Sequence, residues 1–240
     1  IIMSTTVAES HEFVISVQGL SKAFANLKVL EKINVSVRRG ENHVVLGRSG
    51  SGKSVLIKIL AGLLEPDEGS MLMLGQDLTN LDTPGWLALR RRVGFLFQGN
   101  ALYDSMTVRE NLEFPLVRNK RELSLKDIRS AVEEVLKEVG LLQTINQFPA
   151  SLSGGQKKRI GIARTLILKP EIIFYDEPTS GLDPVTCVEI NELIRKVQQQ
   201  YNTSAILITH DLTCARSTGD RISLLADGHF VCTGSFDDVF

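Results

Sequence analysis

The stretch VVLGRSGSGKSVLIKILAGLL, residues 44–64, indicates the fold of this 240-residue chain. It is an apolar run, then a glycine-rich loop that matches GxxxxGK[ST] in full, then apolar residues at helical spacing. A loop between a strand and a helix turns its backbone N–H groups toward phosphates at a helix N-terminus, whose dipole favours anions. The alternative is an ordinary glycine-rich turn, but the flanking strand and helix favour a phosphate site.

The loop therefore predicts a nucleotide site. Lys53 would reach the β and γ phosphates, and the Ser54 hydroxyl would bind Mg²⁺. The candidate residues of the loop are Gly47, Arg48, Ser49, Gly50, Ser51, Gly52, Lys53 and Ser54.

A pair of carboxylates ends the apolar strand EIIFYDE, residues 171–177. Asp176 would hold Mg²⁺ through water, and Glu177 would act as the general base toward the attacking water. Two carboxylates at a strand end can also be merely solvated. The phosphate loop in the same chain favours the catalytic interpretation.

The segment LSGGQ, residues 152–156, predicts a second anion-binding helix end, because Ser153 can cap the helix and two glycines expose backbone N–H groups. One domain would then hold two phosphate sites for one nucleotide. The simplest arrangement is a homodimer in which each nucleotide lies between the loop of one subunit and LSGGQ of the other. The candidate residues of this segment are Ser153, Gly154, Gly155 and Gln156.

A basic run, Lys157, Lys158 and Arg159, follows that segment. Such a run either contacts a partner or forms a solvated helix face, and we expect the solvated face.

The composition narrows the class of protein. Hydrophobic residues make up 43% and charged residues 23%, which excludes collagen-like and disordered chains. The net charge of −1 favours neither nucleic acid nor an anionic membrane surface, so no nucleic-acid partner is expected. Cys187, Cys214 and Cys232 lack metal-site spacing, and we expect small buried hydrophobes in a reducing cytosol.

No apolar run reaches the roughly 18 residues that a membrane helix needs. The N-terminus lacks a secretory signal pattern as well. We therefore expect any membrane role to come through a partner subunit.

The order of elements predicts an α/β protein. Short apolar runs at 13–17, 29–37 and 43–46 give a β-rich start, and strands then alternate with helices, which is typical of a mainly parallel sheet covered on both faces. A charged helical insert runs from Val108 to Val139, broken by Pro115 and residues 118–124. We expect further strands at 71–74, 93–97, 171–177, 205–209, 222–225 and 230–232, and further helices at 86–92, 153–168 and 184–200, after His210 and at the C-terminal end.

The loop, LSGGQ, IIFYDEPTSGLD (172–183) and the histidine after AILIT (205–209) together resemble the motif set of the nucleotide-binding subunits of ABC transporters, over nearly the whole chain. The resemblance implies an ATP-hydrolysing chain with ATP and Mg²⁺ as cofactors. It implies a P-loop NTPase core with a mainly parallel sheet, an N-terminal antiparallel β subdomain and a helical signature-motif subdomain. It further implies a single nucleotide-binding domain over 1–240, with the helical subdomain at about 99–165 inserted in the RecA-like core.

The same resemblance implies roles for four further residues. Phe24 resembles the aromatic residue that stacks on adenine, and Gln98 resembles the glutamine that contacts Mg²⁺ and the attacking water. Asp183 resembles the aspartate that links the two active sites, and His210 resembles the histidine that holds the γ phosphate. The family more often has Tyr at the place of Phe24, and a lone phenylalanine is more often a core residue. His210 alone would be a loop histidine, but its position after a buried strand and before Asp211 favours the phosphate role.

A narrower resemblance lies in FQGNALYDSMTVRENLEFPL, residues 97–116, which is similar to the ATPases of Mla-type, MCE-associated systems that move phospholipids between membranes. It implies membrane-spanning permease subunits, a second nucleotide-binding subunit and an MCE-domain substrate-binding protein as partners. It also implies a peripheral location on the cytoplasmic face of the inner membrane.

Two alternatives remain. Gln156 stands where many Mla-type members carry Met, and Gln is shared with amino-acid importers, so an amino-acid uptake ATPase is one. Soluble ABC proteins of translation or DNA repair are the other. Those usually carry two nucleotide domains or long inserts, whereas this chain has one loop, one LSGGQ and no basic arm.

Overall fold

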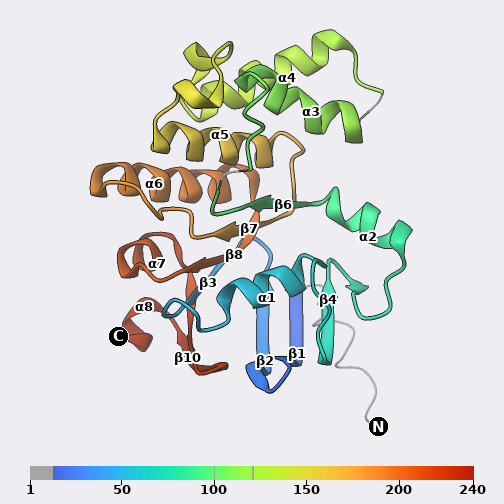
Figure 1. Cartoon of the computed structure of the whole chain (residues 1–240), viewed down its shortest axis with the longest axis vertical. Coiled ribbons are helices and arrows are strands. Elements are labelled where there is room, and N and C mark those ends of the chain that lie inside the picture. Colours follow the sequence, from blue (N-terminus) through green and yellow to red (C-terminus); the bar gives the residue numbers. More distant parts are fainter. Residues whose placement is uncertain (1–12, 100, 121) are drawn as a thin grey trace.

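A six-stranded sheet forms the centre of the protein, which is described by a computed structural model over residues 13–99, 101–120 and 122–240 (Figure 1). In spatial order its strands are β10 (His229–Gly234), β9 (Arg221–Ala226), β3 (Asn42–Leu46), β8 (Ser204–Thr209), β7 (Ile172–Asp176) and β6 (Val93–Leu96). All neighbours run parallel except β10, which is antiparallel to β9. Every residue of β3 and β8 is buried, as expected for parallel strands covered on both faces.

A second, antiparallel sheet has the order β2 (Leu27–Arg38), β1 (Phe13–Phe24), β4 (Glu68–Met73) and β5 (Gln76–Asp77). Its inner face is part of a hydrophobic cluster with α1 (Lys53–Leu60) and one face of the central sheet. Side chains alternate along β7: Ile172 and Phe174 join this cluster, whereas Ile173 and Tyr175 point to the other face. The phosphate-loop helix α1 therefore lies on the same side of the central sheet as the antiparallel sheet.

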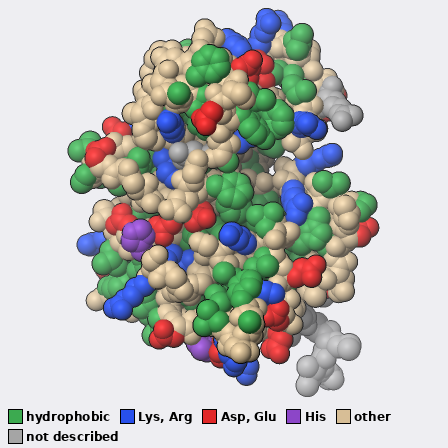
Figure 2. Space-filling model, in the orientation of Figure 1, with side chains coloured by type: hydrophobic (Ala, Val, Ile, Leu, Met, Phe, Trp, Pro, Cys, Tyr) green, Lys and Arg blue, Asp and Glu red, His purple; other side chains and the backbone are tan. Residues whose placement is uncertain are grey.

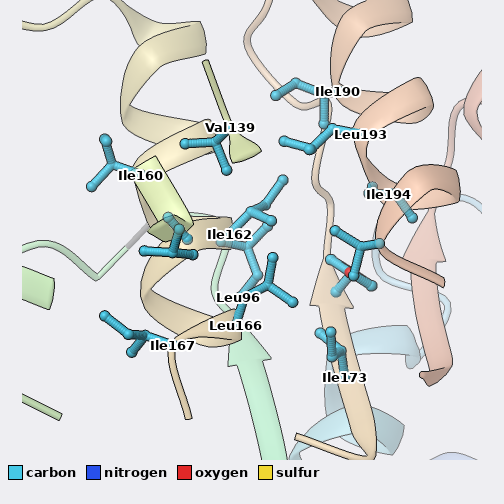
Figure 3. Close-up of a cluster of buried hydrophobic side chains, with 14 of the residues drawn as sticks. Leu96, Val139, Ile160, Ile162, Leu166, Ile167, Ile173, Ile190, Leu193 and Ile194 are labelled. Carbon is cyan, nitrogen blue, oxygen red and sulfur yellow. The ribbon is translucent and has the colours of Figure 1, made fainter. Parts of the chain in front are cut away.

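The other face of the central sheet is covered by α5 (Gly154–Leu166), α6 (Pro184–Tyr201) and α7 (Leu212–Thr218). Figure 3 shows this packing, with Ile162 and Leu166 of α5 close to Leu96 of β6, and with Ile190, Leu193 and Ile194 of α6 on the facing helix. Helices α1 and α5 are thus held on opposite faces of one sheet.

Helices gather at one end of the molecule, beyond α6 (Figure 1). They are α3 (Val108–Asn119), α4 (Leu125–Glu138), the short 3-10 helices η2 (Leu142–Thr144) and η3 (Pro149–Ser151), and α5. The expected helix break at Pro115 is wrong, because α3 continues through it. Proline removes one backbone donor, while the buried side chains of Leu112 and Leu116 hold α3 on both sides of it. The extent of a helical subdomain at about 99–165 stays a prediction.

The α/β fold class with an antiparallel N-terminal sheet is confirmed, and the differences lie at element ends. The helix expected at 86–92 is α2 (Thr83–Arg90), because the Asp82 side chain accepts from Gly85 N and starts the helix earlier. The helix expected at the C-terminal end is α8 (Phe236–Val239). None of the helices within the described ranges has the length and apolar character needed to cross a bilayer. The expectation about a secretory signal falls on residues 1–12, outside the described residues.

The three cysteines only partly match their expected environment. Cys214 is buried, whereas Cys187 and Cys232 are partly exposed, so the expectation of buried thiols is wrong for those two. Cys187 lies in the first turns of α6, where its Sγ is 3.6 Å from the carbonyl oxygen of Thr179.

Candidate nucleotide-binding site

The glycine-rich loop joins the end of β3 to α1, and its backbone requires glycine. Gly50 and Gly52 have φ of 82° and 102°, the left-handed region that other residues rarely adopt. A Cβ on Gly47 would lie 2.5 Å from the carbonyl oxygen of Leu225. A Cβ on Gly50 would meet nothing within 4 Å, so the loop is open on that side. Space for a ligand therefore adjoins a loop whose other side is closely packed.

Lys53 stands at the start of α1 and folds back over this loop. Its Nζ donates to the carbonyl oxygens of Gly47 and Arg48 at 2.8 and 2.9 Å and lies 3.7 Å from Oε1 of Glu177. Burial lowers the pKa of Lys53, and the carboxylates of Glu177 and Asp176 oppose that shift. The loop, the lysine and the carboxylates at the end of β7 therefore form one site.

Asp176 has a buried carboxylate oxygen at the end of β7 that could bind a cation. Its Oδ1 is buried and has no hydrogen-bond partner. Ser51 Oγ in the glycine-rich loop is likewise buried and without a hydrogen-bond partner. Buried polar atoms in proteins nearly always have partners, so these two oxygens fit a bound cation and its phosphate. Burial raises the pKa of Asp176, and the neighbouring Glu177 raises it further. No cluster of three or more His, Cys, Asp or Glu side chains that could hold a metal ion occurs in the described ranges.

Glu177 is held from several directions. Both of its carboxylate oxygens lie near His210, with Nδ1 at 3.0 Å from Oε1 and 2.9 Å from Oε2. Thr209 Oγ1 donates to Oε2 at 3.4 Å. The backbone of Glu177 has φ of 48°, an unusual conformation for a residue with a side chain, and strain of this kind is concentrated at functional sites.

Gln98 follows β6 and lies beside this group. Its side-chain Nε2 donates to Ser180 Oγ at 3.4 Å, and its carbonyl oxygen accepts from Lys158 Nζ at 2.8 Å. Lys158 also donates to the carbonyl oxygen of Glu177 at 3.4 Å. The structure therefore brings five of the candidate residues together at the carboxyl ends of β3, β6, β7 and β8: Lys53, Gln98, Asp176, Glu177 and His210.

The expectation that Lys158 is solvated is wrong, since this residue is 2% exposed. It shares the buried face of α5 with Gly161, Ile162 and Thr165, which follow it by three, four and seven residues. That helical spacing was the signal in the sequence that could have placed Lys158 inside. Lys157 is partly buried, and Arg159 pairs with Glu189.

The LSGGQ segment forms the expected helix start. Ser153 Oγ accepts from Gln156 N at 3.2 Å, and Gln156 Oε1 accepts from Ser153 N at 2.9 Å, which is a capping box. Gly155 has a packing role instead of only exposing its N–H, because a Cβ there would lie 2.4 Å from Cγ2 of Thr186. Among the described residues, no hydrogen bond or ion pair joins this segment to the glycine-rich loop.

Two other predicted residues also lie apart from the carboxylates. Phe24 is 45% exposed, so the core alternative does not hold, and Lys22 Nζ lies 5.6 Å from the centre of its ring. Asp183 caps α6 by accepting from the backbone N–H groups of Val185 and Thr186. The stacking of Phe24 on adenine and the link that Asp183 would make between two active sites both stay predictions.

Residues 30–180 match the family described as ABC transporter. The chain belongs to this family. One relative is the methionine import ATP-binding protein MetN of Caulobacter vibrioides, which is 39% identical over 228 residues, or 94% of this chain and 68% of that protein.

Another relative is the probable ribonucleotide transport ATP-binding protein mkl of Mycobacterium leprae, 40% identical over 92% of this chain. The match covers 63% of the mkl protein, so the chain spans less than two thirds of that relative's length.

Solved ABC structures have the same fold. The cbiO1 protein from Clostridium perfringens, part of the ABC transporter complex cbiONQ, aligns with a TM-score of 0.88 at 31% identity, covering 95% of this chain and 91% of that one. The ATP-binding cassette MJ0796, solved as a dimer in a post-hydrolysis state with ADP and Pi, aligns with a TM-score of 0.84 at 32% identity, covering 92% and 98%. These similarities indicate that the domain binds ATP and is an ATPase domain.

Proposed function

We propose that this chain is the ATP-hydrolysing subunit of a membrane ABC transporter. The observation that carries the proposal is the grouping of Lys53, Glu177 and His210 beside the unpartnered Oδ1 of Asp176. A cation, a general base and a polar imidazole beside an open glycine loop are the groups that phosphoryl transfer to water requires.

Each residue has a separate part in the reaction. The loop N–H groups and Lys53 bind the β and γ phosphates and offset their charge. Glu177 accepts a proton from a water molecule as the water oxygen attacks the γ phosphorus. The bond from that phosphorus to the bridging oxygen breaks, which releases ADP and phosphate. His210 moves from Glu177 to the γ phosphate and orients it.

Ser54, Asp176 and Gln98 are the residues that would hold Mg²⁺, and the unpartnered oxygen of Asp176 fits that assignment. The ion would offset charge on the β and γ phosphate oxygens. Phe24 would stack on the adenine ring, and its exposed ring leaves a face free for that contact.

The proposed active form is a homodimer. No hydrogen bond or ion pair of the described residues joins the glycine loop to the signature residues Ser153, Gly154, Gly155 and Gln156 of the same chain. In the dimer these residues would bind the nucleotide of the other copy, with Asp183 at the junction. Val185, Val188 and Leu212, which flank Asp183 and His210, are 71%, 49% and 49% exposed. A second copy would cover these apolar side chains. The dimeric cassette among the similar structures supports this arrangement.

The variant Glu177→Gln tests both parts of the proposal. Removing the base lowers the hydrolysis rate by about 100-fold or more while ATP still binds. Because the bound ATP is not hydrolysed, it would then hold the dimer closed. Light scattering after gel filtration would detect the mass of this dimer. The control Glu192→Gln changes an exposed carboxylate on α6 and keeps the parent rate. Hydrolysis at the parent rate in Glu177→Gln would exclude the base assignment, and a monomer with ATP would exclude the shared site.

The membrane partner would bind at an apolar groove. Figure 2 shows apolar side chains in a hollow at the middle of the molecule. A pocket there is lined by Leu63, Trp86 and Phe97 among others, with Arg90 at its side. A short helix from a permease subunit fits such a groove, which would place the chain on the cytoplasmic face of the membrane.

For the substrate we propose phospholipid transport with an MCE-domain partner, on the resemblance of residues 97–116 to Mla-type ATPases. Amino-acid import is the second candidate, because a methionine import protein is a close relative and Gln156 is shared with amino-acid importers. Ribonucleotide transport stands in the name of another relative.

Co-purification after mild detergent extraction separates these cases. Recovery of the chain with permease subunits and an MCE-domain protein would support phospholipid transport. Recovery with a solute-binding protein for an amino acid would support import instead. Recovery with ribosomes or DNA and no membrane protein would exclude a transporter.

A further inference from the structure

Lys158 is a buried lysine next to the site but has no part in the reaction described above. It lies on the inner face of α5, two residues after LSGGQ, and is 2% exposed. A buried ammonium group is costly unless hydrogen bonds and opposite charges compensate it. The groups that offset the cost of burying the Lys158 ammonium show which parts of the protein this side chain holds.

Both hydrogen-bond acceptors of Lys158 are backbone carbonyl oxygens beside the reacting groups. One belongs to Gln98 at 2.8 Å, and the other belongs to Glu177 at 3.4 Å. Burial lowers the pKa of Lys158, and the carboxylates of Asp176 and Glu177 work against this shift. The ammonium is therefore balanced by the same two carboxylates that form the site.

The two acceptors follow different strands. Gln98 comes after β6, and Glu177 comes after β7. The backbone of Glu177 has φ of 48°, and its N–H donates to Ile208 O at 3.0 Å while its carbonyl oxygen accepts from Lys158. Both backbone polar groups of this residue are therefore held. One side chain thus joins α5, the loop of Gln98 and a strained residue at the catalytic position.

We propose that Lys158 is a positioning residue for ATP hydrolysis, which sets the placement of Glu177 and Gln98 relative to the LSGGQ helix. The ammonium does not touch the nucleotide. It holds the two carbonyl groups at a fixed separation, so a movement of α5 is transmitted to the base and to Gln98. This inference rests on the proposed roles of Glu177 and Gln98.

The test compares three variants of the full chain: Lys158→Met, Lys158→Gln and the control Lys157→Met. Methionine fills the volume of the lysine without donating, and glutamine restores an uncharged N–H donor. Lys157 is the preceding lysine on the same helix, and its side chain makes no hydrogen bond or ion pair to the residues that the structure describes, whereas its backbone N–H donates to Ser153 O within the helix. Steady-state kcat and KM, binding of a non-hydrolysable ATP analogue and thermal unfolding are measured for each.

We expect Lys158→Met to lower kcat by about tenfold or more, while KM and analogue binding change by less than about twofold. Lys158→Gln should recover at least about threefold of the lost kcat, because the amide can donate to one carbonyl. In a Gln98→Ala background the effect of Lys158→Met should shrink to less than about threefold, because part of it acts through Gln98.

Several results would overturn the proposal. One is a kcat of Lys158→Met that stays within about twofold of the parent value. Another is a loss of kcat in Lys157→Met as large as that in Lys158→Met. A third is a joint loss of folding and analogue binding in both Lys158 variants, which would mean a purely structural role. The variant Glu177→Gln distinguishes failure of the Lys158 proposal from failure of the assignment of Glu177 as the base. If Glu177→Gln is inactive and Lys158→Met fully active, only the inference about Lys158 fails.

Discussion

His210 Nδ1 lies within 3.0 Å of both carboxylate oxygens of Glu177, although 33 positions separate the two residues in the chain. They meet because β7 and β8 are neighbouring parallel strands, with Asp176 paired to Ile208, so both residues lie at the same edge of the sheet. In this structure the imidazole contacts the base and not a phosphate. Binding of ATP would have to exchange one contact for the other.

Removal of His210 tests this relationship. We expect His210→Ala to lower kcat by about tenfold to 100-fold, because the γ phosphate and the base both lose an orienting partner, with a smaller change in KM. His229→Ala is a matched control, since His229 is similarly exposed and also lies near a glutamate, Glu31. Steady-state ATPase assays give the answer. Equal kcat values for both variants would contradict the role of His210.

The close contact of Gly155 with Thr186 predicts a stability defect with a specific remedy. A Cβ at Gly155 would lie 2.4 Å from Cγ2 of Thr186, so Gly155→Ala should lower the free energy of unfolding by about 1–3 kcal/mol. When Thr186→Ser is added to Gly155→Ala, that methyl group is removed, and most of the lost free energy of unfolding should be restored.

Gly154→Ala is the control for that experiment, because its Cβ would lie an ordinary 3.4 Å from Leu182 and should cost less than about 0.5 kcal/mol. Urea unfolding measures all four proteins. A Gly155→Ala defect that Thr186→Ser leaves unchanged would show that the clash is not its cause.

His43 predicts a pH dependence of stability. Its side chain is 1% exposed, its Nε2 lies 2.8 Å from Ser223 Oγ, and Arg221 Nε donates to its Nδ1. Burial lowers the pKa of His43 below 6.5, Glu41 opposes this shift, and the charge of Arg221 adds to it. The unfolded chain therefore takes up the proton first, so stability present above pH 6.5 is lost as the pH falls.

We expect the free energy of unfolding to decrease from pH 7.5 to 5.5, and His43→Gln to flatten this slope by up to about 1.4 kcal/mol per pH unit. Urea unfolding at several pH values measures the slope. His229→Gln, at an exposed histidine, should keep the slope of the parent. An unchanged slope in His43→Gln would mean that another group titrates.

Asn111 organises the segment before α3 and gives a prediction about local stability. It is fully buried, its Nδ2 donates to the carbonyl oxygens of Tyr103, Met106 and Thr107 at 3.0 Å, and its Oδ1 accepts from Tyr103 N at 2.8 Å. Asn111→Leu should cost about 2 kcal/mol or more, because it leaves these groups without partners.

Hydrogen exchange measures this effect residue by residue, and exchange at 101–107 should rise more than in β3 or β8. Asn80→Leu, at an exposed asparagine, is the control. A uniform rise over the whole chain would argue against a local role for Asn111.

Local patterns in the sequence were sufficient for the fold class and for the choice of the candidate site residues, whose roles stay predictions. GRSGSGKS between a strand and a helix predicted the phosphate loop, and the apolar runs before Asp176 and His210 predicted two buried strands of one sheet. These features depend on residues within a few positions of one another, where backbone geometry and hydrophobic period determine the outcome. Parallel strands with buried ends then bring their final side chains together without further information.

The contacts between segments that are distant in the chain were decided only by the tertiary structure. The sequence predicted a solvated Lys158, yet the packing of α5 on the sheet encloses its ammonium between the carbonyl groups of Gln98 and Glu177. Gly155 looked like an exposed phosphate-binding glycine, but the approach of α6 also requires it for packing. Burial and charge compensation are sums over neighbours that are far apart in the chain, and helix-on-sheet packing selects those neighbours.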